Sequence, residues 1–328
     1  MGYARLDRRR WPELRGNGAR SNHAFHRAAR KGIPLIPILP PPSHRPVAGA
    51  TRILSTLLET RTGQLLSESR MWRMETVLKP IMRTHGLPDL DALAGRLVSA
   101  KDARLEEDVV NALLNNESSF FRDLQIYDML YRDILPHIHE HKADRTLRVW
   151  SAGCSTGQEA YSIAMQLRKD DYRWRGWRIE ILASDISTDA IARAKSGIFS
   201  QIDVQRGLAI GDLLKWFEPA GDDWKASDEL RRMVDFRTDN LFDPRAPTGA
   251  YDLIMCRNVL LYFTAERRRR VFDLLARHGH DQSVLVLGAG ETVIGQSDDF
   301  MPHPQFRGVY ARGPAPSSGI GAPIRRAG

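Results

Sequence analysis

The sequence predicts an α/β fold, in which a mostly parallel sheet carries helices on both faces and follows a small all-α domain. Between residues 51 and 116 the apolar side chains recur only with the period of a helix. From residue 147 onward, short strand-like runs alternate with amphipathic helical runs. Such alternation is typical of parallel strands joined by helical crossovers.

Residues 51–116 are predicted to form about four short helices. Turn signals separate them at Gly63, at His85–Pro88 and at Lys101–Asp102. The apolar residues that recur at helical spacing are Ile53, Leu54, Leu57, Leu58, Met74, Val77, Leu78, Ile81, Leu90, Leu93, Leu97, Val109, Val110, Leu113 and Leu114. A linker over residues 117–146 is expected to contain a further amphipathic helix, from about Leu124 to His139.

Residues 147–312 carry the alternation that predicts the sheet. The expected strands are residues 147–150, 179–183, 251–256 and 284–287, and the expected helices are residues 158–168, 189–196 and 266–278. The stretch from about 201 to 236 interrupts the alternation and is interpreted as a small inserted subdomain. Residues 313–328 are expected to form a flexible tail.

The net charge of +8 first suggests a nucleic-acid partner, but its position argues against one. Residues 1–50 contain ten basic and two acidic side chains, whereas the other 278 residues contain 38 of each. Because residues 1–50 show no helical or strand period, they indicate either a basic, disordered extension or a start codon assigned too far upstream. We therefore expect no nucleic-acid partner.

Composition also argues against membrane, disulfide-rich and metal-binding classes. No apolar run approaches the roughly 18 residues that a membrane span requires, and the first residues lack the apolar stretch of a secretory signal. The two cysteines, Cys154 and Cys256, provide neither a disulfide framework nor metal-ligand spacing. We expect a cytoplasmic protein without membrane insertion or a metal site.

Three polar clusters follow strand-like runs and predict a ligand crevice. They are the small-residue loop Ser151–Gly157, the carboxylate Asp185 and the segment Asn240–Asp243. At the carboxyl edge of a parallel sheet these groups can frame an adenosine-containing ligand, with Asp185 accepting the ribose hydroxyls. The alternatives are a tight turn without a ligand, a helix N-cap at Asp185 and ordinary polar loops.

Five sequence blocks, in order along the chain, resemble the CheR family of chemotaxis receptor glutamate O-methyltransferases. The blocks are Asn116–Asp123, Ser151–Ser162, Ala183–Ile186, Asn240–Leu241 and Cys256–Phe263, and the resemblance covers roughly residues 51–312. It implies that the α/β region is a Rossmann-like domain that uses S-adenosylmethionine. The implied reaction forms methyl esters on chemoreceptor glutamates and releases S-adenosylhomocysteine.

By position, the resemblance assigns one set of residues to the cofactor: Asn116, Ser118, Arg122, Glu159, Asp185, Asn240, Leu241, Arg257 and Asn258. It places Arg122 and Tyr262 at the reacting centre as the expected catalytic residues. Departures from the family pattern are mild. Ser118 keeps the hydroxyl of the usual Thr, Ser119 replaces another small residue, and Ala160 stands where Pro is frequent.

The implied reaction needs no conventional catalytic base. A glutamate carboxylate, with a pKa of about 4.3, is ionised at neutral pH, and a sulfonium methyl group is already activated. Positioning is then the main task, in which Arg122 orients the incoming carboxylate or the cofactor and Tyr262 lines the transfer channel. On the residues alone, an Arg122 ion pair with a neighbouring helix and a Tyr262 that fills the core stay open.

The resemblance also implies a partner, the glutamate-rich cytoplasmic helices of methyl-accepting chemoreceptors. A helix over residues 70–83 offers four basic side chains to such a surface, although a solvated helix face is the alternative. These are Arg70, Arg73, Lys79 and Arg83.

Some relatives bind a receptor's C-terminal pentapeptide through a glycine-rich loop. Here Glu218–Trp224 holds one glycine, which predicts that this tether binding is absent.

Two other functions stay open. One is a methyltransferase that acts on RNA or a small molecule, and the other is a binding-only relative that senses S-adenosylmethionine with little turnover. Convergence of Arg122, Asp185 and Tyr262 on one pocket would favour the enzyme over the binding-only protein. The residues indicate neither the receptor, nor the modified glutamates, nor the oligomeric state.

Overall fold

The computed structural model describes residues 48–242, 250–303, 306 and 308–313, all of which lie in one compact unit, Arg45–Gly328. The expected basic extension up to residue 47 and the expected tail from residue 314 lie outside the described residues, as does Asp243 of the third polar cluster. In the described part of the chain, no helix has the length and apolar character needed to cross a membrane.

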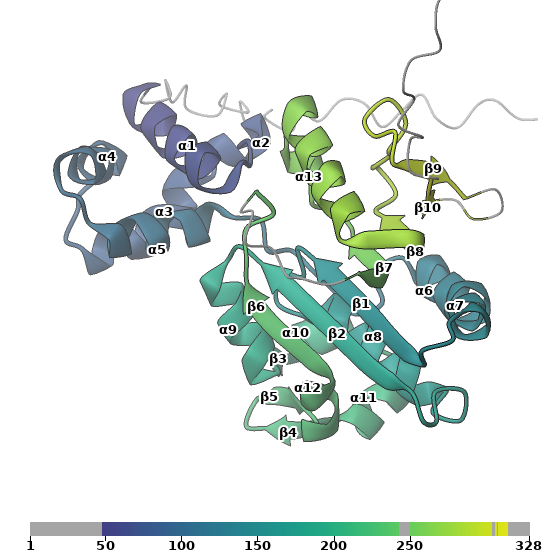
Figure 1. The fold of residues 1–328 in the computed structure, drawn as a ribbon. Coiled ribbons are helices and arrows are strands. Elements are labelled where there is room, and N and C mark those ends of the chain that lie inside the picture. The colour runs from purple at the N-terminus through teal and green to yellow at the C-terminus, as the bar shows by residue number, and fades with distance from the viewer. Residues whose placement is uncertain (1–47, 243–249, 304–305, 307, 314–328) are drawn as a thin grey trace, which may run out of the picture. The chain divides into compact units, whose positions relative to one another are not determined.

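The first described region is all-helical (Figure 1). Its helices are α1 (Ala48–Thr62), α2 (Glu68–Met71), α3 (Met74–Thr84), α4 (Leu90–Ser99) and α5 (Ala103–Leu113). The apolar faces of α1, α3, α4 and α5 meet in one core. Asp89 caps α4, since its carboxylate accepts a hydrogen bond from the Ala92 amide at 2.8 Å, and Asp102 caps α5 in the same way. The helix expected over residues 70–83 is divided between α2 and α3, because the chain turns at Trp72–Arg73.

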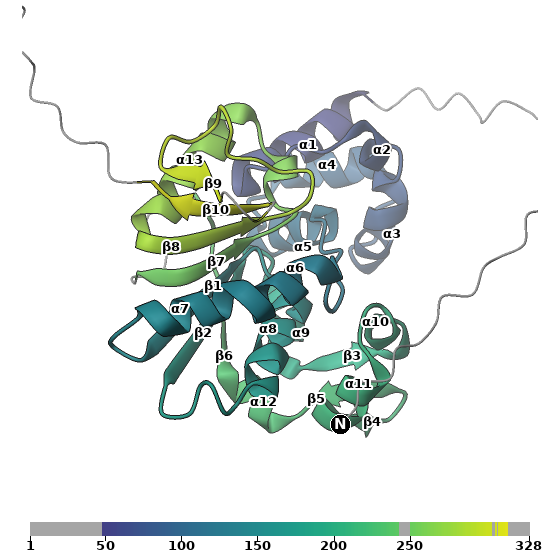
Figure 2. The same ribbon diagram turned by 90° about the vertical axis from the view of Figure 1, so that its right-hand side faces the viewer.

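The linker forms one helical stretch in three parts. These are α6 (Leu124–Met129), the π-helical η1 (Leu130–Ile134) and α7 (Leu135–His141), where a helix from about Leu124 to His139 is expected. Tyr127, Leu130 and Ile134 are buried in the core beneath it. Figure 2 shows α6 and α7 running along the sheet on the side that also carries α8 (Gln158–Lys169).

Seven strands form the main sheet, in the order β6-β2-β1-β7-β8-β10-β9. They are β1 (Thr146–Ala152), β2 (Arg178–Asp185), β6 (Val234–Thr238), β7 (Tyr251–Cys256), β8 (Gly279–Leu287), β9 (Phe300–Pro302) and β10 (Val309–Arg312). The first five in this order are parallel, whereas β10 is antiparallel to both β8 and β9. Since β2 and β7 flank β1 on opposite sides, the strand order reverses at β1, and a ligand crevice is expected at its carboxyl end.

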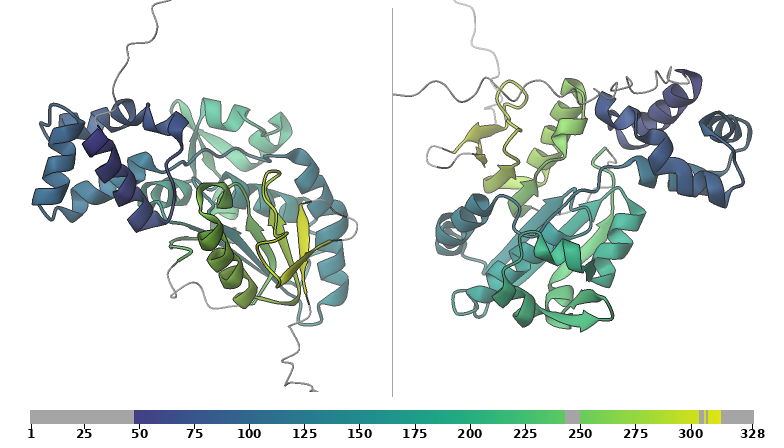
Figure 3. Two further views of the ribbon diagram at one scale, coloured as in Figure 1. Left: turned by 90° about the horizontal axis from the view of Figure 1, so that it is seen from above. Right: turned by 180° about the vertical axis from the view of Figure 1, so that it is seen from behind.

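Helices cover both faces of this sheet (Figures 1 and 3). The linker helices, α8 and α9 (Thr188–Ser196) contribute to one core, and α13 (Ala265–Arg277) contributes to the other. Successive β1 residues alternate between the two cores, with Val149 in the first and Trp150 in the second. Both faces are therefore apolar, as is usual for a parallel sheet. The expected α/β fold class is confirmed.

A second, three-stranded antiparallel sheet follows α9, in the order β3-β5-β4. Its strands are β3 (Ile198–Ser200), β4 (Phe217–Ala220) and β5 (Asp223–Ala226), accompanied by α10 (Gln201–Gln205), α11 (Ile210–Trp216) and α12 (Asp228–Met233). The bounds expected for the insertion, residues 201–236, differ at both ends from those in the structure. The small sheet begins at Ile198, and Val234–Thr238 is β6, which pairs with β2 in the main sheet. As a short edge strand with alternating charged residues, β6 lacks the apolar run of a central strand.

A buried carboxylate, Asp252, ties β7 to three other elements. It accepts hydrogen bonds from the Arg148 amide at 2.7 Å and from Nε2 of His280 at 2.8 Å, and it forms an ion pair with Lys142. Burial alone would raise the pKa of Asp252, but the bonds from His280, Lys142 and Arg148 outweigh it, so the pKa lies below its ordinary 3.8. The contribution of Asp252 to stability is therefore present above that ordinary value and is lost as the pH falls through the lowered one.

Replacing Asp252 with Asn is expected to lower the free energy of unfolding by about 3 kcal/mol at neutral pH, because Lys142 loses its buried counter-ion. Urea unfolding at several pH values measures this change, and the difference from wild type should shrink as the medium is acidified. Asp235→Asn is the matched control, since Asp235 is exposed and its pairing with Arg237 is worth less than about 1 kcal/mol. An equal loss in both variants would contradict the role given to Asp252.

Candidate active site

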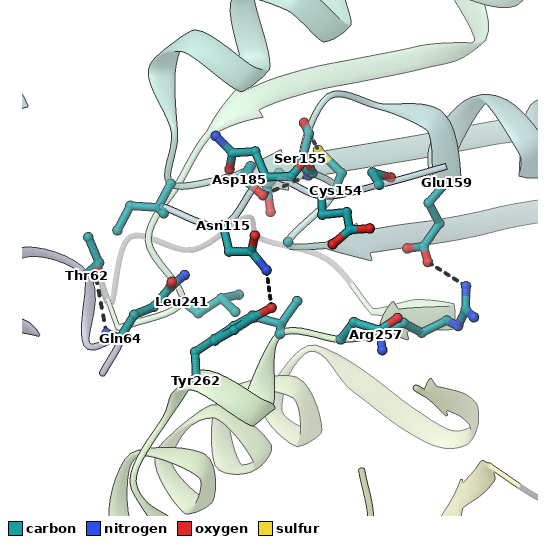
Figure 4. A pocket seen from close by; sticks show the side chains of 18 of the residues that line it. Thr62, Gln64, Asn115, Cys154, Ser155, Glu159, Asp185, Leu241, Arg257 and Tyr262 are labelled. Carbon is teal, nitrogen blue, oxygen red and sulfur yellow. Dashed lines mark hydrogen bonds and ion pairs between the residues drawn. The ribbon is translucent and has the colours of Figure 1, made fainter. Parts of the chain in front are cut away.

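A pocket lies at the carboxyl ends of β1, β2, β6 and β7, and the end of α1 with the loop after it forms one wall (Figure 4). All ten predicted site residues line it: Asn116, Ser118, Arg122, Glu159, Asp185, Asn240, Leu241, Arg257, Asn258 and Tyr262. They come from Asn116 and the linker after it, from the first turn of α8, from the end of β2 and from the segments that follow β6 and β7. The structure thus brings them together, and the role of each stays a prediction.

The loop after β1 depends on small residues. Gly153 has a φ of +80°, and a Cβ there would lie 2.4 Å from Cγ2 of Val259, while Gly157, with φ +92°, is the N-cap residue of α8. Between them, Ser155 also has a positive φ, and its Oγ donates a hydrogen bond to the Asn116 carbonyl at 2.7 Å. The loop can therefore contact the linker and the segment after β7 directly.

Asp185 ends β2 and faces the pocket with both carboxylate oxygens engaged. Oδ2 accepts from the Ser155 amide at 2.8 Å and Oδ1 from the Ser187 amide at 2.9 Å, and a carboxylate can accept further donors beyond these. Burial raises the pKa of Asp185 above 3.8, although the backbone amides of Ser187, Ser155 and Ile186 act in the opposite direction. Asp185 is not the N-cap of α9; that residue is Ser187, whose Oγ accepts from the Ala190 amide.

Arg257 is a buried cation, with 2% of its side chain exposed. Its guanidinium pairs with Glu159 at 3.2 Å and with Asp123, and it donates to the Arg122 carbonyl at 2.9 Å. Burial lowers the pKa of Arg257, but Glu159, Tyr127 and Asp123 outweigh burial, and the pKa is raised. Because protein groups already hold this guanidinium, its first effect is to fix the segment that carries Arg122.

Arg122 lies between two residues in the left-handed region, Phe121 (φ +47°) and Asp123 (φ +63°). Such conformations persist where the surroundings hold them. Here the side chain of Phe121 is buried, and its amide donates to Oγ of Ser162 at 3.0 Å. The Arg122 guanidinium donates to the Glu117 carbonyl at 3.4 Å, and within the described residues no carboxylate forms an ion pair with it. Among the residues that the structure describes, the alternative of an Arg122 ion pair with a neighbouring helix is therefore not found.

Tyr262 projects into the pocket from the short 3₁₀ helix η2 (Leu260–Tyr262). Its hydroxyl accepts a hydrogen bond from the amide group of Asn115, and its carbonyl accepts one from the Leu65 amide at 2.7 Å. It is half-buried, so it does not fill the core. Glu291 holds η2 in place, since its carboxylate accepts from the amides of Leu260 and Asn258 at 2.7 and 2.8 Å.

Several pocket residues were not predicted as site residues: Thr62, Gln64, Asn115, Glu117, Ile186, Asp239, Val259 and Phe263. Asn115, Glu117, Ile186 and Asp239 are the sequence neighbours of Asn116, Asp185 and Asn240, so their positions in the sequence carry a signal for the pocket. Thr62 and Gln64 carry no comparable signal, because they lie at the end of a helix of the all-α region and not after a strand. Cys154 also lines the pocket, and burial raises the pKa of its thiol well above 9.0, so the thiol is protonated at neutral pH.

Sequence comparison gives the geometry a family context. The model of the family "CheR methyltransferase, SAM binding domain" matches residues 116–308. The chemotaxis protein methyltransferase of Vibrio parahaemolyticus is 34% identical over 252 residues, which cover 76% of this chain and 91% of the relative. Chemotaxis protein methyltransferase 1 of Pseudomonas aeruginosa is 32% identical over 254 residues, covering 76% and 92%.

Among solved structures, the magnesium protoporphyrin IX methyltransferase of Synechocystis PCC 6803 with bound SAH aligns with a TM-score of 0.28 and 17% identity. That alignment covers 52% of this chain and 61% of the other.

The cofactor of the matched domain is S-adenosylmethionine, and the pocket residues fit it. Asp185 offers acceptors to a ribose diol, and the carboxylate of Glu159 offers one to an ammonium group. Leu241 and Phe242, after β6, supply the apolar lining that a purine ring needs.

Replacing Asp185 with Ala is expected to weaken S-adenosylhomocysteine binding at least about tenfold, because charge-assisted bonds to the ribose are lost. Isothermal titration calorimetry measures this affinity, and Asp189→Ala, an exposed change on the following helix, is the control. Since the pKa of Asp185 is raised, acidification should weaken binding by the wild type at a higher pH than an ordinary aspartate would allow. Unchanged affinity in the Asp185 variant would refute its assignment to the ribose.

Proposed function

The chain belongs to the CheR methyltransferase family, and on that premise we propose that it methylates glutamate side chains of methyl-accepting chemoreceptors. The family membership makes it an S-adenosylmethionine-dependent methyltransferase of chemotaxis. The proposal adds the acceptor, a glutamate carboxylate, and the partner, the cytoplasmic helices of a receptor. Methyl esters and S-adenosylhomocysteine are the products.

The observation that carries the proposal is the convergence of Arg122, Asp185 and Tyr262 on one pocket. A protein that only binds the cofactor needs a ribose acceptor such as Asp185 but has no use for a cation and a phenol beside it. Arg122 is free of carboxylate partners among the described residues, whereas Arg257 is enclosed by them. Arg122 is thus the pocket guanidinium that suits an incoming carboxylate.

The carboxylates of the pocket support a reaction without a general base. Glu159 is paired with Arg257 and accepts from Oγ of Ser151 at 2.8 Å, and Asp185 accepts two backbone amides. A glutamate substrate is already ionised at neutral pH and needs no proton removed. When bound, the cofactor supplies an activated methyl group, so the protein's task is to hold the acceptor in line with it. Arg122 would attract and orient the acceptor, and Tyr262 would border its path.

The proposed receptor surface lies on α2 and α3 and differs from the sequence prediction at one residue. Arg70 is half-buried and donates to the Leu113 carbonyl, so it serves the helical core more than a partner. Arg73, Lys79 and Arg83 are exposed, and Trp72 beside them is 76% exposed. An exposed aromatic next to cations suits an acidic helix with an apolar stripe.

Methyl transfer is tested with radiolabelled S-adenosylmethionine on receptor-containing membranes. Base-labile label on receptor glutamates is the expected result. Arg122→Ala should lower kcat/KM about a hundredfold through lost orientation, and Tyr262→Phe about tenfold. Arg132→Ala, an exposed change on the linker helix, is the control and should retain full activity. Cofactor binding without any transfer to receptors would instead favour the binding-only protein.

We further propose that methylation is independent of a receptor pentapeptide tether. The segment Glu218–Trp224 forms most of a tight hairpin, in which β4 and β5 are joined at Gly221, with φ +68°, and Asp222. A turn of this length leaves no glycine-rich loop to hold a peptide. Calorimetry with a chemoreceptor C-terminal pentapeptide should give no binding isotherm at millimolar peptide. Measurable affinity would overturn this part of the proposal.

A further inference from the structure

Gln64 brings a buried, unpartnered amide oxygen to the pocket. The residue is 9% exposed, lines the pocket, and has an Oε1 atom without a hydrogen-bond partner among the described residues. Leaving such an acceptor buried and unpaired costs about 1–3 kcal/mol. Among the described residues with an unpaired buried Gln Oε1, Gln64 is the one that lines the pocket, where a ligand can supply the missing donor.

The loop that carries Gln64 is held rigidly at the end of α1. Oγ1 of Thr62 donates to the Leu58 carbonyl at 2.7 Å and accepts from the Gln64 amide at 3.1 Å. Gly63 has a φ of +77°, and a Cβ there would lie 2.4 Å from Cε2 of Phe242. A side chain at position 63 would push this loop away from the segment after β6. The glycine therefore allows the two segments to be in contact.

The position of Gln64 along the sheet edge indicates which donor it meets. The acceptors of the pocket follow the strand order β6-β2-β1-β7, with Asp185 after β2 and Glu159 beside β1 and β7. If the ribose lies at Asp185 and the ammonium group at Glu159, the purine must extend the other way, toward β6. Asn240 donates to the Arg61 carbonyl at 3.3 Å, which places the Gln64 loop at that β6 end. In Figure 4 Gln64 and Leu241 lie on one side of the pocket and Glu159 and Arg257 on the other.

We propose that Oε1 of Gln64 accepts a hydrogen bond from the exocyclic amino group of the cofactor's adenine. The all-α region then takes part in cofactor recognition and selects adenine over purines that lack this donor. The proposal depends on the cofactor and not on the receptor substrate, so absence of receptor methylation would leave it intact.

The test compares S-adenosylhomocysteine with S-inosylhomocysteine, whose purine has a carbonyl in place of the amino group. The full-length wild type should bind the adenosine compound about a hundredfold more tightly by calorimetry, because the inosine carbonyl would face Oε1. Gln64→Met keeps the side-chain length and removes the acceptor. It should weaken S-adenosylhomocysteine binding about tenfold and reduce the preference between the two ligands to a few-fold.

Gln205→Met makes the same chemical change at an exposed position of α10 and should leave both affinities as in the wild type. Thermal unfolding of each variant without ligand distinguishes a loss of binding from a loss of folding. The variant Gln64→Glu retains an acceptor at this position and should restore the preference for adenine. The proposal is overturned if Gln64→Met discriminates between the two ligands as well as the wild type does. It is also overturned if the wild type prefers the inosine compound, since Gln64 would then act as a donor.

Discussion

The site depends on one buried cation, the guanidinium of Arg257. A charge with 2% of its side chain exposed persists only with partners, and here Glu159 from α8 and Asp123 from the linker provide them. Asp123 has a left-handed backbone conformation where it forms its ion pair with Arg257. This conformation sets the direction of the preceding residue, Arg122. The residue that would bind substrate is therefore positioned by an ion pair that substrate never needs to touch.

The all-α region is joined to the α/β region by polar contacts as well as by packing. Asn111 donates to Oγ1 of Thr188 and accepts from Oγ of Ser187, both at 2.9 Å, and the Ser187 amide donates in turn to Asp185. Arg267 of α13 binds both Glu59 and the Gly63 carbonyl. These contacts hold the loop after α1 against the pocket, so the two regions form one binding unit and not a catalytic domain with an appendage.

Much of the fold and the pocket could be predicted because the residues that follow parallel strands all lie at the carboxyl edge of the sheet. Asp185 and Asn240 follow strands, and Glu159 opens a helix that follows one, so periodicity alone places them near each other. The edge strand β6 was assigned to the insertion because five residues with alternating charges lack the apolar run of a central strand. The place of Gln64 in the pocket and the hydrogen bond from Arg70 to the Leu113 carbonyl could not be predicted, because both depend on how separate segments of the chain pack.

Cys154, in the loop after β1 that borders the pocket, and Cys256, at the end of β7, are both free and buried. Burial raises the pKa of each thiol well above 9.0, so neither presents a thiolate in the native state. A thiol reagent can reach Cys154 only when the loop after β1 opens, and Cys256 only when the central sheet does. The rates at which the two native cysteines react with a thiol reagent thus measure local opening at Cys154 and global opening at Cys256, without any engineered label.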